Sequence, residues 1–373
     1  MNVLVISSDE YLTLRLLKCL ATLNAVIHVI GVGAAVRASR YCRRYTAYDL
    51  SALRHSSAQV CDDIDRYCRL HAIDIVLPSG MESVFLLAAL KDSFKSTRVL
   101  PLAAVEHLRV LNNKWDFARL LKQHGLPEPQ SHLLERIEDA DALDIGFPVI
   151  LKPLELDASR GVVRCDTPAA VQAHLKRPGV TLPLLVQEYV PGTDVGLGLL
   201  AHQGTVVAWS IQKQLPDGSG VEFVKHERIL EIGRRILSVC RYDGIAHFDM
   251  RIDARDGSVQ VLECNPRFWA SLPFCMLAGV NFADLAIRLA LDEPLPESAY
   301  QTLSVTFPTK ALSGVLSGGI LEWGLSKPSR QALGFTLSDP LPQVCLGAGR
   351  LRRKMETLFI RKPAAVAGQA RGR

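Results

Sequence analysis

The sequence lacks several features that would assign it to whole classes of protein. It has no CxxC pair, and its nine cysteines are scattered and odd in number, which favours reduced, mostly buried thiols over a disulfide framework. Its first residues lack the basic region and cleavage site of a signal peptide. No apolar run approaches the roughly 20 residues that a membrane-spanning helix needs. We therefore expect a cytoplasmic protein without a membrane span.

Charge is spread unevenly along the 373 residues, whose net charge is +5. Residues 350–373 hold eight Lys or Arg and one Glu, so the remaining body, with 35 basic and 37 acidic residues, carries −2. A body of this charge is not a nucleic-acid surface, and no nucleic acid is expected as a partner. Contact of the basic tail with an anionic membrane or nucleic acid stays open, although a solvated, frayed end is the simpler interpretation.

Residues 1–108 show the strand–helix alternation of an open α/β domain. Short β-rich runs alternate with segments of helical periodicity, which predicts a parallel sheet with strands at Val3–Ile6, Val26–Ile30 and Ile73–Leu77 and helices at Leu12–Leu23, Ala58–His71 and Glu82–Lys91. The loop Ser7-Ser8-Asp9 has no glycine fingerprint, which argues against a dinucleotide site. Pro78–Gly80 fits the lining of a cleft and a structural turn equally well.

The stretch His247–Trp269 predicts a β-hairpin that carries acidic side chains. Its arms are Ala246–Ala254 and Ser258–Cys264, joined by the three-residue turn Arg255-Asp256-Gly257. Such a turn pairs Ala254 with Ser258 and therefore Asp249 with Glu263. A two-residue turn would instead put Asp249 opposite Leu262 and send the carboxylates to different faces.

Three oxygen ligands, Asp249, Glu263 and Asn265, would then converge on one face, and hard oxygen ligands suit magnesium. Arg267 lies two residues beyond Asn265, near enough to meet the same anion. The alternative is an ordinary hairpin with solvated carboxylates; the pattern acid, then acid-x-Asn-x-Arg, favours the metal site. Cys264 should point to the opposite, packed face.

Two lysines stand where phosphate contacts are expected. Lys114 follows Asn112 and Asn113, either of which can cap a helix that ends near Gly125 and Pro127, and a helix start favours anions. Lys152 is the one charge in the buried strand 147–153. Its ammonium group must face a cleft, because burial without a partner costs desolvation free energy. The alternative is that the side chain extends from the strand end into solvent.

Three further segments fit nucleotide contacts less specifically. The loop with Ser159, Arg160 and Gly161 could fold over phosphates, although it holds only one glycine. Within residues 183–200, Pro191-Gly192 introduces a kink between two strands. Exposed backbone at this kink can hydrogen-bond the edge of a nucleobase, and Asp194 can accept hydrogen bonds from ribose hydroxyls. Taken alone, the kink would be only a strand connection. Arg228 begins the helix 228–240 and fits a carboxylate-binding residue and a structural ion pair equally.

In this order, these residues resemble the ATP-grasp superfamily, nearest to its carbamoyl-phosphate-synthetase-like and carboxylate–amine ligase branches. The resemblance covers about residues 1–295 and rests on Asn113-Lys114, Ile150–Pro153, Ser159–Gly161, Gln187–Gly192, Asp249 and Glu263-x-Asn265-x-Arg267. It implies α/β and α+β architecture in four parts. These are a Rossmann-like pre-grasp domain (1–108), a small lid subdomain (109–186), a large subdomain with the metal-binding hairpin (187–300) and a C-terminal extension with a basic tail (301–373).

The resemblance also implies roles for individual residues. Lys114 and Lys152 would contact phosphates, together with Ser159 and Gly161. The Gln187 side chain would meet the adenine amino group, and the backbone of Glu188 and Val190 would contact the same edge of the base. Asp194 would contact the ribose. Asp249, Glu263 and Asn265 would hold two Mg²⁺ ions, with Mn²⁺ as a substitute, while Arg267 and Lys152 would act in catalysis.

The implied activity is an ATP-dependent carboxylate–amine or carboxylate–thiol ligase that works through an acyl phosphate on small-molecule substrates, with a homodimer as a family-level expectation. Two alternatives remain: a carbamoyl- or carboxy-phosphate-forming enzyme with partner subunits, and a non-catalytic ATP-binding regulatory protein.

Overall fold

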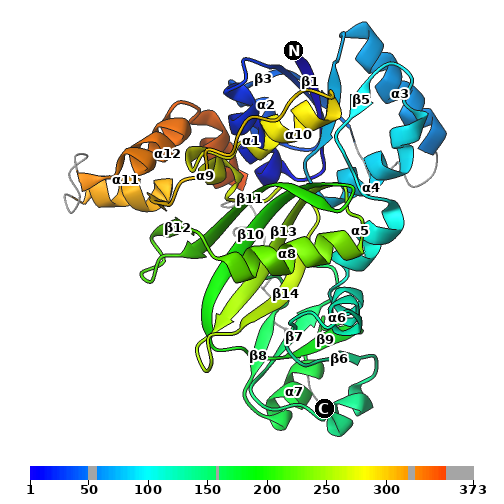
Figure 1. Cartoon of the computed structure of the whole chain (residues 1–373), viewed down its shortest axis with the longest axis vertical. Coiled ribbons are helices and arrows are strands. Elements are labelled where there is room, and N and C mark those ends of the chain that lie inside the picture. Colours follow the sequence, from blue (N-terminus) through cyan, green and yellow to red (C-terminus); the bar gives the residue numbers. More distant parts are fainter. Residues whose placement is uncertain (49–56, 157–158, 318–323, 350–373) are drawn as a thin grey trace, which may run out of the picture.

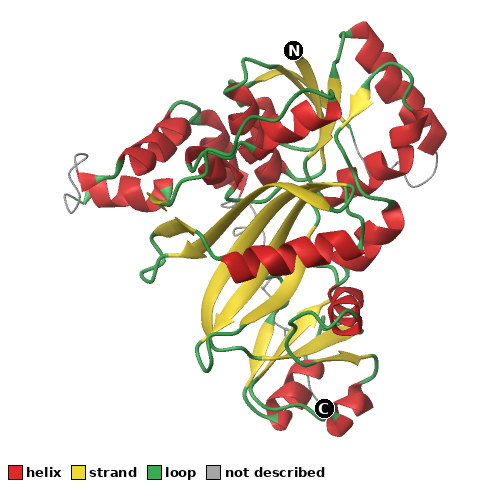
Figure 2. Cartoon of the chain, in the orientation of Figure 1, coloured by secondary structure: helices red, strands yellow, loops and turns green. Residues whose placement is uncertain are grey.

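The computed structural model describes residues 1–48, 57–156, 159–317 and 324–349. The described residues form three sheets with their helices. In the view of Figure 1 the parallel sheet lies at the top, the six-stranded sheet crosses the middle under helix α8, and the four-stranded sheet lies below. Figure 2 shows the strands as the inner parts of these layers and the helices at their faces and edges. The fold is therefore mixed α/β.

The first sheet has five parallel strands in the order β3-β2-β1-β4-β5. Its middle strands are almost wholly buried, because helices cover both faces of a parallel sheet. The strands are β1 (Asn2–Ser7), β2 (Val26–Gly31), β3 (Cys42–Ala47), β4 (Ile75–Pro78) and β5 (Arg98–Val99), and the helices are α1 (Glu10–Ala21), α2 (Ala34–Arg37), α3 (Ser57–Leu70) and α4 (Met81–Leu90). The predicted parallel sheet is confirmed; β3 was not predicted.

The second sheet is antiparallel and small, in the order β6-β9-β7-β8. Its strands are β6 (Ser131–Leu134), β7 (Val149–Pro153), β8 (Val163–Cys165) and β9 (Leu184–Glu188), and α5 (Val105–Asn112) and α6 (Lys114–Gln123) precede it. With α7 (Pro168–Leu175) it has its own apolar core, which includes Leu134, Val149, Leu151, Val171 and Val186. A separate core is what a subdomain requires.

The third sheet has six strands in the order β14-β13-β10-β11-β12-β15, and every pair is antiparallel. The strands are β10 (Gly192–His202), β11 (Thr205–Gln214), β12 (Gly220–Val224), β13 (Gly244–Asp253), β14 (Val259–Asn265) and β15 (Leu303–Thr306). Helix α8 (Glu227–Val239) packs its apolar stripe on one face, against Leu197 and Leu199 at Gly233. The other face carries Asp249 and Glu263.

Further helices lie in the middle and the C-terminal part of the described chain. They include α9 (Leu272–Leu277), α10 (Phe282–Ala290), α11 (Pro308–Leu316) and α12 (Lys327–Leu337), and residues 341–349 are helical as well. Asp339, just after α12, accepts hydrogen bonds from the Ser39 hydroxyl (2.5 Å) and the Arg40 backbone N–H (2.9 Å), so this part packs on the first domain. The basic tail at 350–373 lies outside the described residues.

The predicted domain limits stay predictions. The limit at 186 falls within β9, and β15, beyond the limit at 300, pairs with β12 in the six-stranded sheet. All nine cysteines are free, with seven buried and two half-buried. None of the helices in the described ranges has the length and apolar character needed to cross a bilayer.

Candidate functional site

The β13–β14 hairpin brings Asp249 and Glu263 face to face, as predicted, but not through the predicted turn. The loop has four residues: Asp253 N–H donates to Ser258 O (2.8 Å), and Gly257 N–H donates to Asp253 O (2.9 Å). The pairing of Ala254 with Ser258 is therefore wrong. This turn starts a register that would pair Asp249 with Leu262, but an irregularity between Met250↔Val261 and Asp249↔Glu263 leaves Leu262 unpaired and restores the facing acids.

The two carboxylates interact with each other at partly exposed positions, with 43% of the Asp249 side chain and 24% of the Glu263 side chain accessible to solvent. Burial and the neighbouring Glu263 raise the pKa of Asp249 well above its usual value. Burial acts to raise the pKa of Glu263 too, but Lys114 and the hydrogen bond with Asp249 outweigh it and hold that pKa below its usual value. Cys264 is buried in the apolar core on the other face, as expected.

Asn265 and Arg267 extend the row of polar side chains. Asn265 Nδ2 donates to Asp249 Oδ2 at 3.0 Å, and Arg267 Nη2 donates to Asn265 Oδ1 at 2.9 Å. Arg267 Nη1 also donates to Phe268 O at 3.0 Å. The side chains at 249, 263, 265 and 267 therefore form one connected cluster, with a cation at its end.

Lys114 reaches this cluster from the start of α6. Asn113 caps the helix by accepting from the N–H groups of Trp115 (3.1 Å) and Asp116 (3.2 Å), which selects Asn113 over Asn112 as the cap. The Lys114 ammonium lies 3.2 Å from Glu263 Oε2 and donates to Leu156 O at 2.7 Å. Only 7% of Lys114 is exposed, so its charge is directed into the site.

Lys152 enters the same electrostatic environment from β7. It is 8% exposed and donates to Gln187 Oε1 at 2.7 Å, while Gln187 Nε2 donates to the Ser131 hydroxyl at 3.1 Å. Burial lowers the pKa of Lys152 to about 8; Glu263 and Asp249 act against this shift, and Lys114 adds to it. These mutual effects mean that both lysines and both carboxylates act on one small region.

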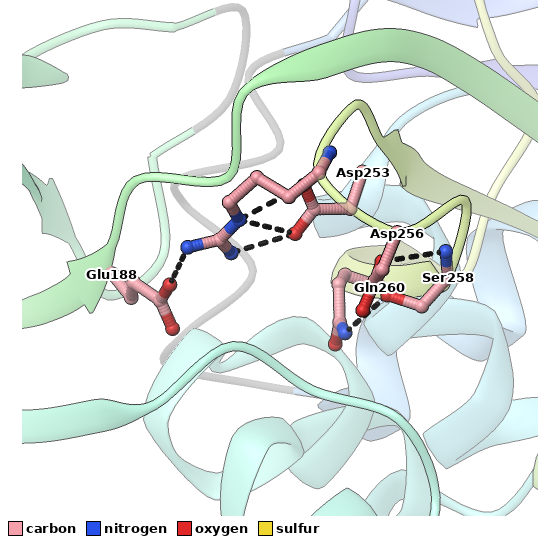
Figure 3. A network of polar contacts seen from close by, with 6 residues as sticks. Glu188, Asp253, Asp256, Ser258 and Gln260 are labelled. Carbon is pink, nitrogen blue, oxygen red and sulfur yellow. Dashed lines mark hydrogen bonds and ion pairs between the residues drawn. The ribbon is translucent and has the colours of Figure 1, made fainter.

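The end of β9, the link to β10 and the start of β10 carry the other predicted contacts. Glu188 pairs with Arg255 of the hairpin turn at 2.8 Å, which Figure 3 shows, and Val190 is buried. Asp194 is mostly exposed and lies 3.2 Å from Arg251 Nε. These residues therefore lie along the junction of the two antiparallel sheets.

Three predicted residues are less closely tied to the cluster. Ser159 (φ 57°) and Gly161 (φ 72°) lie in the loop between β7 and β8, and a Cβ at Gly161 would meet Pro153 Cγ at 2.8 Å. Residues 157 and 158 of this loop lie outside the described residues. Arg228 forms an ion pair with Glu231 at 3.0 Å within α8, which is the structural alternative.

Magnesium fits this donor set. Across residues 1–48, 57–156, 159–317 and 324–349, no group of three or more His, Cys, Asp or Glu gathers as in zinc sites. Asp249, Glu263 and Asn265 instead offer two carboxylates and an amide oxygen, the hard ligands that magnesium accepts when phosphate and water complete its shell. A divalent cation would relieve the repulsion that raises the pKa of Asp249.

Sequence reasoning missed three residues around this cluster. His247 and Arg251 are two residues either side of Asp249 and so share its face, a signal that strand periodicity provides. His247 Nδ1 lies 3.6 Å from Asp249 Oδ1, and burial, followed by Arg267, lowers the pKa of His247 to about 3. Arg255 was assigned only to the turn, because nothing local indicates its distant partner Glu188.

Comparisons with known proteins match two overlapping parts of the chain to related family models. A model described as "RimK-like ATP-grasp domain" matches residues 111–218, and one described as "ATP-grasp in the biosynthetic pathway with Ter operon" matches residues 181–310. The large chain of carbamoyl phosphate synthase from Thermoanaerobacter sp. (strain X514) is 25% identical over 218 residues. That match covers 53% of this chain, and the chain spans about a fifth of the length of the curated relatives it matches (20% of this one).

Solved structures share the fold at low sequence identity. N5-carboxyaminoimidazole ribonucleotide synthetase from Thermotoga maritima has a TM-score of 0.60 at 15% identity, covering 81% of this chain and 79% of the other. L-amino acid ligase from Bacillus licheniformis has a TM-score of 0.59 at 19% identity, covering 80% and 76%. The biotin carboxylase domain dimer of Hydrogenobacter thermophilus 2-oxoglutarate carboxylase, solved with MgADP and bicarbonate, has a TM-score of 0.61 at 16% identity, covering 81% and 72%. The two overlapping family matches together cover residues 111–310, and with the cluster of lysines and carboxylates described above they assign this part of the chain to the ATP-grasp superfamily.

Proposed function

We propose that this protein is an ATP-dependent ligase that joins a small carboxylic acid to an amine through an acyl phosphate. The observation that carries the proposal is the facing pair of Asp249 and Glu263 with the Lys114 ammonium 3.2 Å from Glu263. Lys152, which comes from another sheet, interacts electrostatically with the same two carboxylates. Paired carboxylates next to two buried ammonium groups suit a polyphosphate with its cation better than any single-charged ligand.

Different residues contact the phosphates, the adenine and the ribose of the nucleotide. Lys114 and Lys152 offset phosphate charge, with the loop at Ser159 and Gly161 beside them, and Gln187, Glu188 and Val190 meet the adenine. Asp194 accepts from the ribose hydroxyls. Asp249, Glu263 and Asn265 would hold Mg²⁺, as two ions or with Mn²⁺ in its place, which would supply neutralisation of charge on the phosphates.

The reaction needs positioning and charge neutralisation more than covalent help. A carboxylate oxygen of the substrate bonds to the γ-phosphorus of ATP while the bond to ADP breaks, which gives an acyl phosphate. The amine nitrogen then bonds to the acyl carbon and loses a proton, and phosphate leaves. Arg267 is placed by Asn265 to stabilise the oxyanion that develops in these steps. A thiol acceptor would follow the same course.

Two observations favour a second candidate, in which the acid is bicarbonate and the product a carboxy or carbamoyl phosphate. The biotin carboxylase neighbour was solved with MgADP and bicarbonate, and the sequence relative reported above is a carbamoyl phosphate synthase large chain. Partner subunits would then supply the nitrogen or the final acceptor.

Two further properties belong to the proposal. The free cysteines support a reducing, cytoplasmic location. A homodimer is supported only by the dimeric biotin carboxylase domain among the neighbours, and light scattering of the purified protein tests it.

Positional isotope exchange tests the proposal without knowledge of the amine. ATP labelled with ¹⁸O in the β–γ bridge is incubated with Mg²⁺ and single acids from a panel that includes bicarbonate. Reversible acyl phosphate formation moves the label into non-bridging positions of the β-phosphate. Exchange with an organic acid supports the ligase, and exchange with bicarbonate alone supports the second candidate.

Two variants make the result specific. Glu263→Gln should abolish exchange, whereas Glu231→Gln, on the exposed side of α8, should retain it. If ATP binds but no acid promotes exchange or ADP release, and Asp249→Asn leaves binding unchanged, the protein is a nucleotide-binding protein without this chemistry.

A further inference from the structure

A short connector, residues 188–191, joins the four-stranded sheet to the six-stranded sheet. On the β9 side, Glu188 N–H donates to Gln130 O (2.9 Å) and Tyr189 N–H donates to Pro148 O (3.0 Å). On the other side, Ala254 N–H, in the hairpin turn, donates to Pro191 O (2.9 Å). The connector therefore belongs to both sheets, and its backbone fixes their junction.

Arg255 is the side chain that ties the start of this connector to the hairpin. Asp253, which is 3% exposed, accepts from Arg255 Nε on both carboxylate oxygens (3.0 Å each) and from Nη2 (2.6 Å). This fork fixes the guanidinium and leaves Nη1 to reach Glu188 Oε1 at 2.8 Å. Figure 3 shows Asp253 and Glu188 on opposite sides of the guanidinium, with dashed contacts to each.

The rest of the junction is held from both sheets as well. The Tyr189 ring contacts two guanidinium groups, that of Arg164 from β8 (4.3 Å to the ring centre) and that of Arg251 from β13 (5.4 Å). Arg251 also donates to Gly192 O at 3.2 Å. The connector is thus contacted by arginines that come from different sheets.

We propose that Arg255 is a positioning residue for base recognition: it holds the connector at Glu188 in a fixed place relative to the carboxylates of the same hairpin. This inference rests on the proposed function, in which residues 187–190 meet the adenine and Asp249 and Glu263 the metal–phosphate end of the same nucleotide. Arg255 touches neither end. It sets the distance between them, because Asp253 ends the strand that carries Asp249 and Glu188 ends the strand that carries Gln187.

The expected effect is modest, because Arg255 is half-exposed and water screens its pair with Glu188. We expect a loss of about three- to five-fold in ATP affinity when either partner is neutralised, since a half-exposed pair of this geometry contributes little more. A charge reversal is unsuitable, because a carboxylate at 255 would face the buried Asp253.

Calorimetric titration with MgATP and MgGTP tests the inference in Arg255→Met, Glu188→Gln and the double variant. Each single variant should weaken ATP binding, and the double variant should be no worse than Arg255→Met alone, because that variant has already lost the contact with Glu188. GTP binding should change less, since the connector backbone is positioned for the adenine edge. The ATP-to-GTP preference should therefore fall, a change that a general loss of stability would not produce.

The controls separate this inference from the proposed function. Asp256→Asn changes the same turn, but the Asp256 carboxylate accepts from Ser258 N–H (2.8 Å) and not from Arg255, so both affinities should stay as in the wild type. Glu188→Gln leaves the Asp253–Arg255 fork intact, so the test holds even if Arg255→Met folds poorly. A wild-type protein that binds no nucleotide overturns the proposed function. Wild-type binding with single effects that add in the double variant, or with equal losses for ATP and GTP, overturns the role of Arg255 alone.

Discussion

Asp249 lies opposite Glu263 although the turn that joins their strands starts one residue out of register for this pairing. The extra residue, Leu262, restores the register before the ladder reaches Asp249. Since a one-residue slip moves a side chain to the other face of a sheet, the acid pair depends on this irregularity as much as on the two acids.

The first prediction concerns the acid pair. Asp249→Asn and Glu263→Gln should each lower Mg²⁺-dependent turnover roughly 100-fold or more, because a metal that stabilises phosphoryl charge contributes several kcal/mol. Steady-state ADP release with an acid found by isotope exchange measures this. Glu231→Gln is the matched control on the opposite side of the sheet, and a comparable loss there would mean that the effect is not specific to the pair.

Much of the site was predictable because its chemistry is local in sequence. The pattern Glu263-x-Asn265-x-Arg267, the lysine after the cap Asn113 and the single charge in the strand 149–153 each identify a residue that the structure brings to one cluster. The facing of Asp249 and Glu263 was predicted correctly from an incorrect turn. Sequence offers no signal for the irregularity at Leu262, which depends on how the whole ladder fits.

What could not be predicted depends on contacts distant in sequence. Strand β3, with the sequence CRRYTA, has no buried residue and no alternation, because it lies at the edge of its sheet. β15 joins the six-stranded sheet only through its pairing with β12. From the sequence Arg255 is an ordinary turn residue, and only the structure shows its ion pair with Glu188 of another sheet.

A second prediction concerns Lys114. Lys114→Met should weaken MgATP binding about ten-fold or more, because it removes a buried charge-assisted contact and leaves the Leu156 carbonyl and Glu263 without that donor. Calorimetry measures the change. Lys122→Met, in the last turn of the same helix, should bind ATP like the wild type. Equal affinities for Lys114→Met and wild type would contradict a phosphate role for Lys114.

A third prediction concerns Gly196, which pairs with Asp249 across β10 and β13. A Cβ at Gly196 would meet His247 Nε2 at 2.7 Å, so Gly196→Ala should push the imidazole against Asp249. We expect a clear loss of turnover with only a small loss in the free energy of unfolding. Gly334→Ala, in the interior of α12 with no atom within 4 Å of a new Cβ, should instead stabilise the protein by up to about 1 kcal/mol. Thermal unfolding and ADP release on both variants check this, and full activity in Gly196→Ala would contradict it.

The last prediction concerns pH and Lys152, whose pKa burial lowers from 10.5 to about 8. In the folded protein without nucleotide this lysine loses its proton as pH rises through about 8, so affinity for MgATP should fall above that pH. The free energy of unfolding should change with pH in the opposite direction to the affinity. Between about 8 and 10.5 the unfolded chain binds more protons than the folded one, so this group's unfavourable contribution is full below pH 8 and is relieved as pH rises. Lys152→Met should therefore raise the free energy of unfolding below pH 8 by at most about 3 kcal/mol, the equivalent of the shift, and remove the pH dependence of binding near 8. MgATP titrations from pH 6 to 9.5 measure the affinity, and parallel thermal melts measure the stability. A Lys152→Met protein that is less stable at pH 7 and keeps the wild-type pH dependence of MgATP binding would show that Lys152 is a structural residue.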